Sequence, residues 1–238
     1  FVFATGRSFS GGWTNPFACD QPGLVAFRGG LLALSTVLNF ISIKYLPLPL
    51  IATIMFTAPL LVALMSWPIL KEPVGPLRWI AIVFGFVGVV IAIRPFDGAI
   101  HWSVFVSCTA AITFAAYSVT TRQLSGKVTV DTQQFYTGFV GTAVLLPFAI
   151  FQWSNPASGL DWLLLFGLGA FAWAGHQLLT RAHAMAPANL LMPFSYSFML
   201  YLTVWSILIF KYVPDVWNLV GAAIVIGASL LNWQSSRR

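Results

Sequence analysis

The chain has 238 residues, of which 58% are hydrophobic and only 8% are charged, and its mean hydropathy is +0.85. A soluble globular domain carries about 25% charged residues, so this composition excludes a soluble domain and predicts a polytopic membrane protein. The net charge of +6 comes from twelve basic and six acidic residues. Because the basic residues lie singly between apolar tracts, they do not form a nucleic-acid-binding surface.

Eight apolar stretches are long enough to cross the hydrocarbon core, which takes about 20 helical residues. In chain order these predicted helices are Leu24–Lys44, Pro47–Leu70, Leu77–Arg94, Trp102–Arg122, Thr132–Trp153, Leu160–Arg181, Pro187–Phe210 and Val216–Trp233. The connections between them contain proline, glycine and charged residues, which end helices. The tracts do not alternate with a period of two, so they predict an all-α membrane protein rather than a strand barrel.

Charge predicts the orientation of this helix bundle. With eight spans, nine basic residues fall on one side of the membrane and three fall on the other. The nine are Arg7, Arg28, Lys71, Arg78, Arg122, Lys127, Arg181, Arg237 and Arg238. The positive-inside rule places this side, and with it the C-terminus, in the cytoplasm.

An internal repeat is visible at an offset of 140 residues. The tract from Pro47 to Lys71 aligns with the tract from Pro187 to Lys211, with six identities in 25 positions. A final apolar tract that contains glycines follows each copy. In the predicted topology the two copies start on opposite sides of the membrane, which makes them an inverted repeat of the kind that is typical of alternating-access carriers.

Ordered motifs in the two halves resemble the EamA-type repeats of the drug/metabolite transporter superfamily. In the first half they are Phe27-Arg28-Gly29-Gly30, Lys44-Tyr45-Leu46-Pro47, Thr57-Ala58-Pro59, Leu70-Lys71-Glu72-Pro73, Gly85-Phe86-Val87-Gly88 and Arg94-Pro95. In the second half they are Gly175-His176, Ala186-Pro187-Ala188, Pro193-Phe194-Ser195-Tyr196, Pro214-Asp215 and Gly221-Ala222-Ala223. The second half departs from the pattern at Lys211-Tyr212, where many members carry a Gly-Glu pair.

The resemblance implies a ten-helix fold of two inverted five-helix halves with both termini in the cytoplasm. Residues 1–98 would then be a truncated first repeat of about three spans, and residues 99–238 a second repeat of five spans. It also implies that the first two helices are absent from this chain, which begins with Phe1.

The segment Ala174–Ala188 holds an unusual group of polar residues within an apolar tract. His176, Thr180 and His183 share one helical face, and Arg181 and His183 are expected at the cytoplasmic rim. His176 lies more than one turn deeper. It is either part of a binding site, the default for an ionisable residue at membrane depth, or a neutral imidazole bonded to a neighbouring helix.

Other polar side chains follow helical stripes that we expect to face the bundle interior. The stripes are Ser35, Asn39 and Ser42; Thr53 and Thr57; and Thr109, Thr113, Tyr117 and Thr120. Such stripes serve either as helix–helix contacts or as the lining of a site. Pro193 frees a backbone carbonyl and either kinks the helix for packing or shapes a site. The predicted substrate-binding residues are Asn39, Thr57, Tyr117, His176, Gln177 and Tyr196.

Nucleotide-binding, hydrolase and metal-binding motifs are absent from the sequence, so we predict neither an enzyme nor a cofactor. The hypothesis is a secondary transporter in the cytoplasmic membrane, whose partners are a small-molecule substrate and the lipid bilayer. The resemblance favours uptake of a vitamin-like or nucleoside-like compound such as riboflavin or S-adenosylmethionine. An exporter of amino acids or drugs, a structural membrane protein and, third, a membrane enzyme remain as alternatives, and the sequence leaves a homodimer open.

Overall fold

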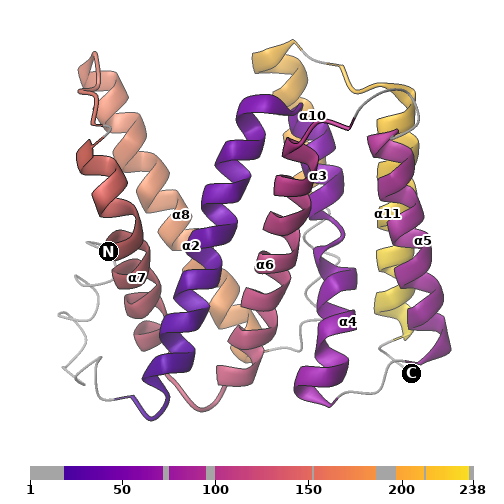
Figure 1. Ribbon diagram of the computed structural model, residues 1–238, viewed down its shortest axis with the longest axis horizontal. Coiled ribbons are helices and arrows are strands. Elements are labelled where there is room, and N and C mark those ends of the chain that lie inside the picture. The colour runs from indigo at the N-terminus through magenta and orange to yellow at the C-terminus, as the bar shows by residue number, and fades with distance from the viewer. Residues whose placement is uncertain are drawn as a thin grey trace. The chain divides into compact units, whose positions relative to one another are not determined.

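The computed structural model describes residues 19–71, 75–94, 100–151, 153–185, 197–211 and 213–235. Within these ranges the regular structure is helical throughout (Figure 1). The helices are α2 (Pro22–Tyr45), α3 (Leu48–Met55), α4 (Ala58–Leu70), α5 (Pro76–Ile93), α6 (Ser103–Leu124), α7 (Val130–Phe151), α8 (Gly159–Met185), α10 (Ser197–Phe210) and α11 (Val216–Ser235). This architecture confirms the predicted all-α bundle. The predicted span ends lie within four residues of the observed ones, except for the start of Pro187–Phe210, because residues 187–196 lie outside the described residues and α10 is described from Ser197.

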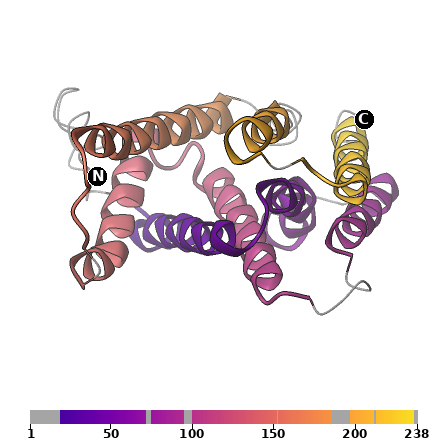
Figure 2. The ribbon, with the colours of Figure 1, turned by 90° about the horizontal axis from the view of Figure 1, so that it is seen from above.

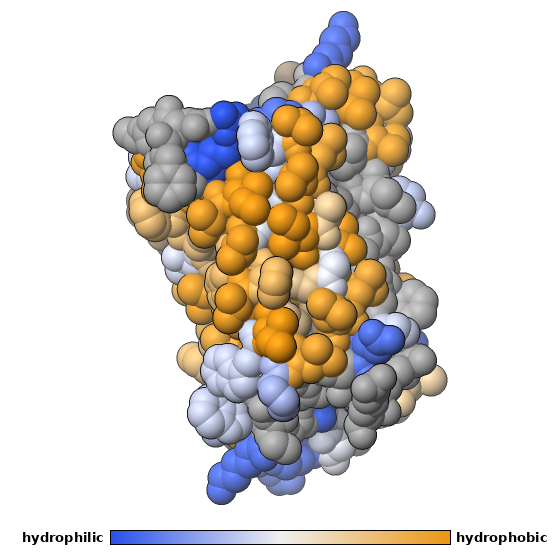
Figure 3. All heavy atoms as spheres, turned by 90° about the vertical axis from the view of Figure 1, so that its right-hand side faces the viewer, coloured by the Kyte–Doolittle hydropathy of each residue, from blue (hydrophilic) through white to orange (hydrophobic). Residues whose placement is uncertain are grey.

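Helix length and composition fit a bilayer. Five described segments are long and apolar enough to cross a membrane: α2, the α3–α4 tract, α6, α7 and α8. Helices α5 and α11 are shorter apolar helices. The face formed by α5 and α11 carries a broad apolar band with hydrophilic residues at both ends (Figure 3). Val83, Phe84 and Val87 are exposed apolar residues of α5.

The helices divide into two compact units, each of which is described by itself. Unit 1 consists of Phe1–Ala33 and Thr120–Ala186, and unit 2 of Leu34–Val119 and Pro187–Arg238. Helices α2 and α6 each contribute one end to unit 1 and the other end to unit 2. Each unit therefore takes residues from both sides of the expected repeat boundary between residues 98 and 99.

In unit 1, α8 packs against α7 (Figure 2). A small apolar core holds the start of α2 and the end of α6 against the start of α7. Its buried members are Val25, Leu124, Phe135 and Tyr136. This end of the unit also holds the charged and amide side chains that form the candidate site.

In unit 2, α5 and α11 pack side by side through glycines (Figure 1). A Cβ atom added at Gly88 would lie 2.8 Å from the carbonyl oxygen of Gly221, and one added at Gly221 would lie 2.5 Å from the carbonyl oxygen of Gly88. Small residues permit such a close backbone approach in membrane helices. A Cβ atom added at Gly85 of α5 would likewise contact the side chains of Leu60 and Ala228. The pairing of positions 88 with 221 and 85 with 228 makes the two helices antiparallel.

Helix bounds in the structure follow the 140-residue offset of the sequence repeat. Helices α2 and α8 end at Tyr45 and Met185, and α4 and α10 end at Leu70 and Phe210. Lys71 and Lys211, which follow α4 and α10, both adopt a left-handed backbone, with φ of 57° and 51°. A left-handed residue is a common way to end a helix, and both copies use a lysine for it.

The tract predicted as one span, Pro47–Leu70, is one membrane-length segment in the structure, Leu48–Leu70, but its helix is interrupted by a turn at Phe56 and Thr57. Helix α3 ends before Phe56 and α4 begins after Thr57. Pro59 has no N–H with which to bond the carbonyl of Met55, so an uninterrupted helix loses a bond at this point. The Thr57 hydroxyl instead donates to the Ile54 carbonyl at 2.6 Å. The break is buried, with Thr57 only 4% exposed.

Candidate functional site

The most polar interior of unit 1 is built around Arg28, whose side chain is 0% exposed although it lies inside the apolar helix α2. Its guanidinium donates to oxygens on three other helices. The acceptors are Thr121 Oγ1 at 2.8 Å, the Gln133 carbonyl at 3.1 Å, Thr137 Oγ1 at 2.7 Å and Thr180 Oγ1 at 3.1 Å. A buried charge is costly unless it is hydrogen-bonded, and these oxygens supply the bonds.

Two of the accepting threonines are themselves fixed in orientation. The Thr137 hydroxyl donates to the Gln133 carbonyl at 2.8 Å, and the Thr180 hydroxyl donates to the His176 carbonyl at 2.8 Å. Each hydroxyl therefore uses its proton within its own helix and turns its lone pairs toward Arg28. Removing either partner of such a buried bond costs about 1–3 kcal/mol, because the other group loses its partner.

The turn of α8 from His176 to Thr180 is also held from α7. Gln134 Nε2 donates to the His176 carbonyl and to Thr180 Oγ1, both at 2.8 Å. Gln177 Nε2 donates to Asp131 Oδ1 at 3.0 Å. Gln177 is 5% exposed, and within the described residues its Oε1 atom has no hydrogen-bond partner. Gln177 thus offers a buried acceptor that a donor group of a ligand could satisfy.

In unit 2, polar residues of α2 and α6 follow the expected stripes only in part. Asn39 is half-buried, and its Oδ1 atom has no partner among the residues that the structure describes. Tyr117 is 2% exposed and lies with its ring centroid 5.8 Å from that of Phe114. The expectation that Thr109 faces the interior is wrong, because Thr109 is exposed and donates to the Phe105 carbonyl of its own helix.

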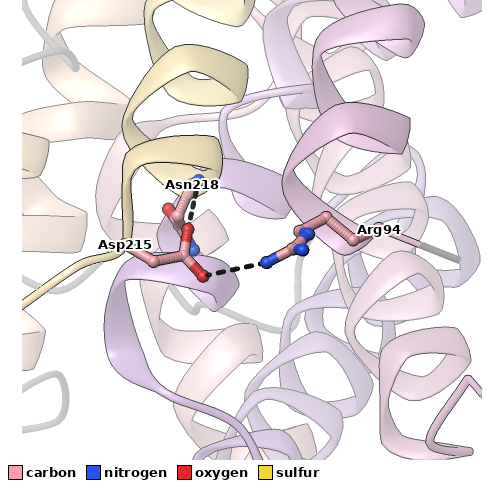
Figure 4. Close-up of polar contacts among 3 residues, drawn as sticks. All are labelled: Arg94, Asp215 and Asn218. Atoms are coloured by element: carbon pink, nitrogen blue, oxygen red, sulfur yellow. Dashed lines mark hydrogen bonds and ion pairs between the residues drawn. The ribbon is translucent and has the colours of Figure 1, made fainter. Parts of the chain in front are cut away.

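A second polar network in unit 2 joins the end of α5 to the start of α11 (Figure 4). Asp215 Oδ1 accepts from the backbone N–H of Asn218 at 2.7 Å and so caps α11, while Asp215 Oδ2 lies 4.0 Å from Arg94 Nη1. The Arg94 guanidinium also lies over the ring of Trp217 at 5.7 Å. Asn218 in turn contacts Thr53 of α3, with Thr53 Oγ1 3.2 Å from Asn218 Oδ1. These contacts tie three helices together at one end of unit 2.

The predicted site residues fall into both units. Asn39, Thr57 and Tyr117 belong to unit 2, and His176 and Gln177 belong to unit 1. Tyr196 and Pro193 lie outside the described residues. Of the residues predicted for the site, the structure brings His176 and Gln177 together on one turn of α8.

Sequence reasoning missed the roles of Arg28 and Gln134. Arg28 was counted as a cytoplasmic charge, yet it lies six residues inside α2 and is fully buried. The available signal was its place between apolar and small neighbours in a tract that is long enough to span. The adjacent amides Gln133 and Gln134 in the apolar helix α7 are a comparable signal. Within the described part of the chain, groups of three or more His, Cys, Asp or Glu side chains that could hold a metal ion do not occur.

Comparison with known proteins relates this chain to a family of transporters. The family model described as the EamA-like transporter family matches residues 1–94 and 101–234. The chain is 29% identical over 186 residues to a riboflavin transporter of Vibrio cholerae, a match that covers 77% of this chain and 62% of that protein. It is 27% identical over 238 residues to an S-adenosylmethionine uptake transporter of Rickettsia felis, covering 100% of this chain and 78% of the relative. The chain thus spans less than two thirds of the riboflavin transporter's length.

Two further likenesses concern export and fold. A pseudopaline exporter of Pseudomonas aeruginosa is 27% identical over 210 residues, covering 87% of this chain and 73% of the exporter. A solved crystal structure with 17% identity superimposes with a TM-score of 0.71, covering 100% of this chain and 85% of that one. The fold is therefore shared with a known structure. With a family match across most of its length and a bundle of apolar helices, this chain is a multi-pass membrane protein that belongs to the EamA-like transporter family.

Proposed function

We propose that this protein is a secondary transporter that moves a small organic metabolite across the cytoplasmic membrane by alternating access. One observation carries the proposal: the membrane-length tract Leu48–Leu70 is interrupted at Phe56 and Thr57 in a buried part of unit 2. Carriers place substrate and ion sites at discontinuous helices near the middle of the bilayer, where the break frees backbone groups.

Alternating access in this proposal comes from rocking of one repeat against the other, and the two repeats are residues 1–98 and 99–238. Their support is the 140-residue offset that relates the ends of α4 and α10 and the left-handed lysines that follow them. The antiparallel packing of α5 and α11, which the same offset relates, agrees with an inverted arrangement. The excess of basic residues on one side of the predicted spans supports a cytoplasmic C-terminus.

The proposed substrate carries several N–H or O–H donors. Support comes from Gln177 and Asn39, which both present buried amide oxygens that lack partners within the described residues. Relatives that take up riboflavin or S-adenosylmethionine by name make these compounds the first candidates. The proposed contacts, tested one unit at a time, are Asn39, Thr57 and Tyr117 in unit 2 and His176 and Gln177 in unit 1, with Tyr196 as a further candidate.

The test is uptake of radiolabelled riboflavin and S-adenosylmethionine by liposomes that contain the intact protein. Saturable uptake of one compound, absent from empty liposomes, is expected. Asn39→Leu and Gln177→Met should each raise KM about tenfold, because a hydrogen bond to a buried group contributes about 1–1.5 kcal/mol. Thr109→Val is the matched control, since the Thr109 hydroxyl is exposed and bonds its own helix.

The outcomes separate the function from the site. Uptake of this substrate class would be refuted if neither labelled compound shows saturable flux and a mixture of vitamins and nucleosides does not reduce the entry of either label. Flux with unchanged KM in Asn39→Leu, Tyr117→Phe, His176→Ala and Gln177→Met would refute the proposed contacts.

An exporter is the second candidate, favoured by the similarity to the pseudopaline exporter. Flux measured in right-side-out and inside-out vesicles distinguishes export from uptake.

A further inference from the structure

Arg28 is bound in a way that restricts the neighbouring helices. Its planar guanidinium reaches Thr121 of α6, Gln133 and Thr137 of α7, and Thr180 of α8 with bonds of 2.7–3.1 Å. Fork-like donors in fixed directions are specific to arginine, whereas a lysine carries a single compact charge. Arg28 therefore fixes four helix segments relative to one another within unit 1.

The α8 end of this network is the turn that carries the candidate substrate contacts. Thr180 accepts from Arg28 Nη2 at 3.1 Å and from Gln134 Nε2 at 2.8 Å, and donates to the His176 carbonyl at 2.8 Å. His176 and Gln177 lie four and three residues before Thr180 on the same turn. The direction in which these two side chains leave α8 depends on how that turn is held.

The glycine beside Arg28 allows α2 to approach α7 closely. A Cβ atom added at Gly29 would lie 3.2 Å from the Cα of Thr137 and 3.2 Å from the carbonyl oxygen of Tyr136. Helix α2 therefore approaches the α7 backbone closely at this residue, which keeps Thr137 within reach of Arg28. At the adjacent Gly30, an added Cβ would meet nothing within 4 Å.

We propose that Arg28 is a positioning residue for substrate binding: by holding Thr180, it sets the orientation of the α8 turn that presents His176 and Gln177. The functional half of this inference rests on the transport function proposed above. The structural half, the immobilisation of the turn, does not depend on it. The two halves are therefore tested by separate measurements on the same variants.

Hydrogen exchange of the detergent-solubilised intact protein tests the immobilisation. Arg28→Lys and Thr180→Val should speed amide exchange in the α8 turn from His176 to Thr180 by about tenfold or more, because loss of a buried bond of about 1.4 kcal/mol changes the opening equilibrium by that factor. Exchange in α5 and α11 of unit 2 should not change. Thr180→Ser keeps the hydroxyl and should restore slow exchange. Unchanged exchange in α8, or an equal rise in both units, overturns the inference.

A paired glycine experiment tests the geometry. Gly29→Ala should loosen the α8 turn, because α2 has to withdraw from the α7 backbone by a few tenths of an ångström. Gly30→Ala should leave exchange in α8 unchanged or slower. Equal exchange in these two variants contradicts the dependence on close α2–α7 approach.

Transport kinetics test the functional half. In Arg28→Lys and Thr180→Val, KM for the transported compound should rise about tenfold while the maximal rate stays within about twofold, since lost ground-state binding appears in KM. Thr180→Val combined with Gln177→Met should raise KM by less than the product of the single effects, because both changes act through one turn. The positioning role is refuted if the maximal rate falls while KM is unchanged, or if KM of the double variant rises by the full product of the single effects. If the unmodified protein does not transport, the proposed function fails, while hydrogen exchange still decides the immobilisation.

Discussion

The close packing of α5 and α11 gives a sharp stability prediction from two glycines of one helix. In α11, a Cβ atom at Gly221 would lie 2.5 Å from the Gly88 carbonyl oxygen, 2.7 Å from Ala92 Cβ and 2.8 Å from Ala92 N. Ordinary van der Waals contact begins at 3.4 Å, so Gly221→Ala requires the helices to separate by about 0.9 Å. At Gly227 an added Cβ would meet nothing within 4 Å.

The magnitudes follow from these distances. Overpacking typically costs 1–3 kcal/mol, and contacts with rigid backbone atoms place Gly221→Ala near the upper end, at about 3 kcal/mol. The gain in helix propensity from glycine to alanine is about 1 kcal/mol. We therefore expect Gly221→Ala to lower the free energy of unfolding by about 2 kcal/mol and Gly227→Ala to raise it by up to about 1 kcal/mol.

Equilibrium unfolding in mixed detergent and SDS micelles, followed by circular dichroism, measures both variants. The expected difference of about 3 kcal/mol corresponds to a more than 100-fold difference in the unfolding equilibrium. Gly88→Ala should resemble Gly221→Ala, because its Cβ would lie 2.8 Å from the Gly221 carbonyl oxygen. Equal stabilities of Gly221→Ala and Gly227→Ala would refute the assignment of the helix contact to Gly221.

Two further predictions concern the ends of helices in unit 2. Asp215→Ala should lower stability by about 1 kcal/mol, because the cap on the Asn218 N–H is lost. Asp215→Asn keeps the cap and should lose less than about 0.5 kcal/mol, since the ion pair with Arg94 is half-exposed and 4.0 Å long. Thermal unfolding of both variants checks this prediction, and equal losses of stability would contradict it. Thr57→Val should lose about 1 kcal/mol because the Ile54 carbonyl loses the bond from the Thr57 hydroxyl, and Thr57→Ser should retain it. Parallel KM measurements on the Thr57 variants then separate a role at the helix break from a contact with substrate.

The sequence determined the helical spans and the family of this protein because both depend on local patterns. A membrane segment has to satisfy its backbone hydrogen bonds within itself, so apolar length and the prolines and charges at its ends are enough to locate it. The prediction Leu77–Arg94 accordingly lies within one residue of α5 at each end. The order of short motifs such as Phe27-Arg28-Gly29-Gly30 was enough to indicate the transporter family, which the family match confirms.

The tertiary structure decided which polar and small residues have partners. Arg28 carries the same side chain whether it marks a cytoplasmic loop or lies fully buried, and only the oxygens of Thr121, Thr137 and Thr180 on other helices make burial tolerable. Gly221 and Gly227 are the same residue in the same helix, yet only Gly221 faces a neighbouring backbone. Helix formation is settled within a few residues of chain, whereas the cost of burying a charge or adding a methyl group is set by atoms that lie far away in the sequence.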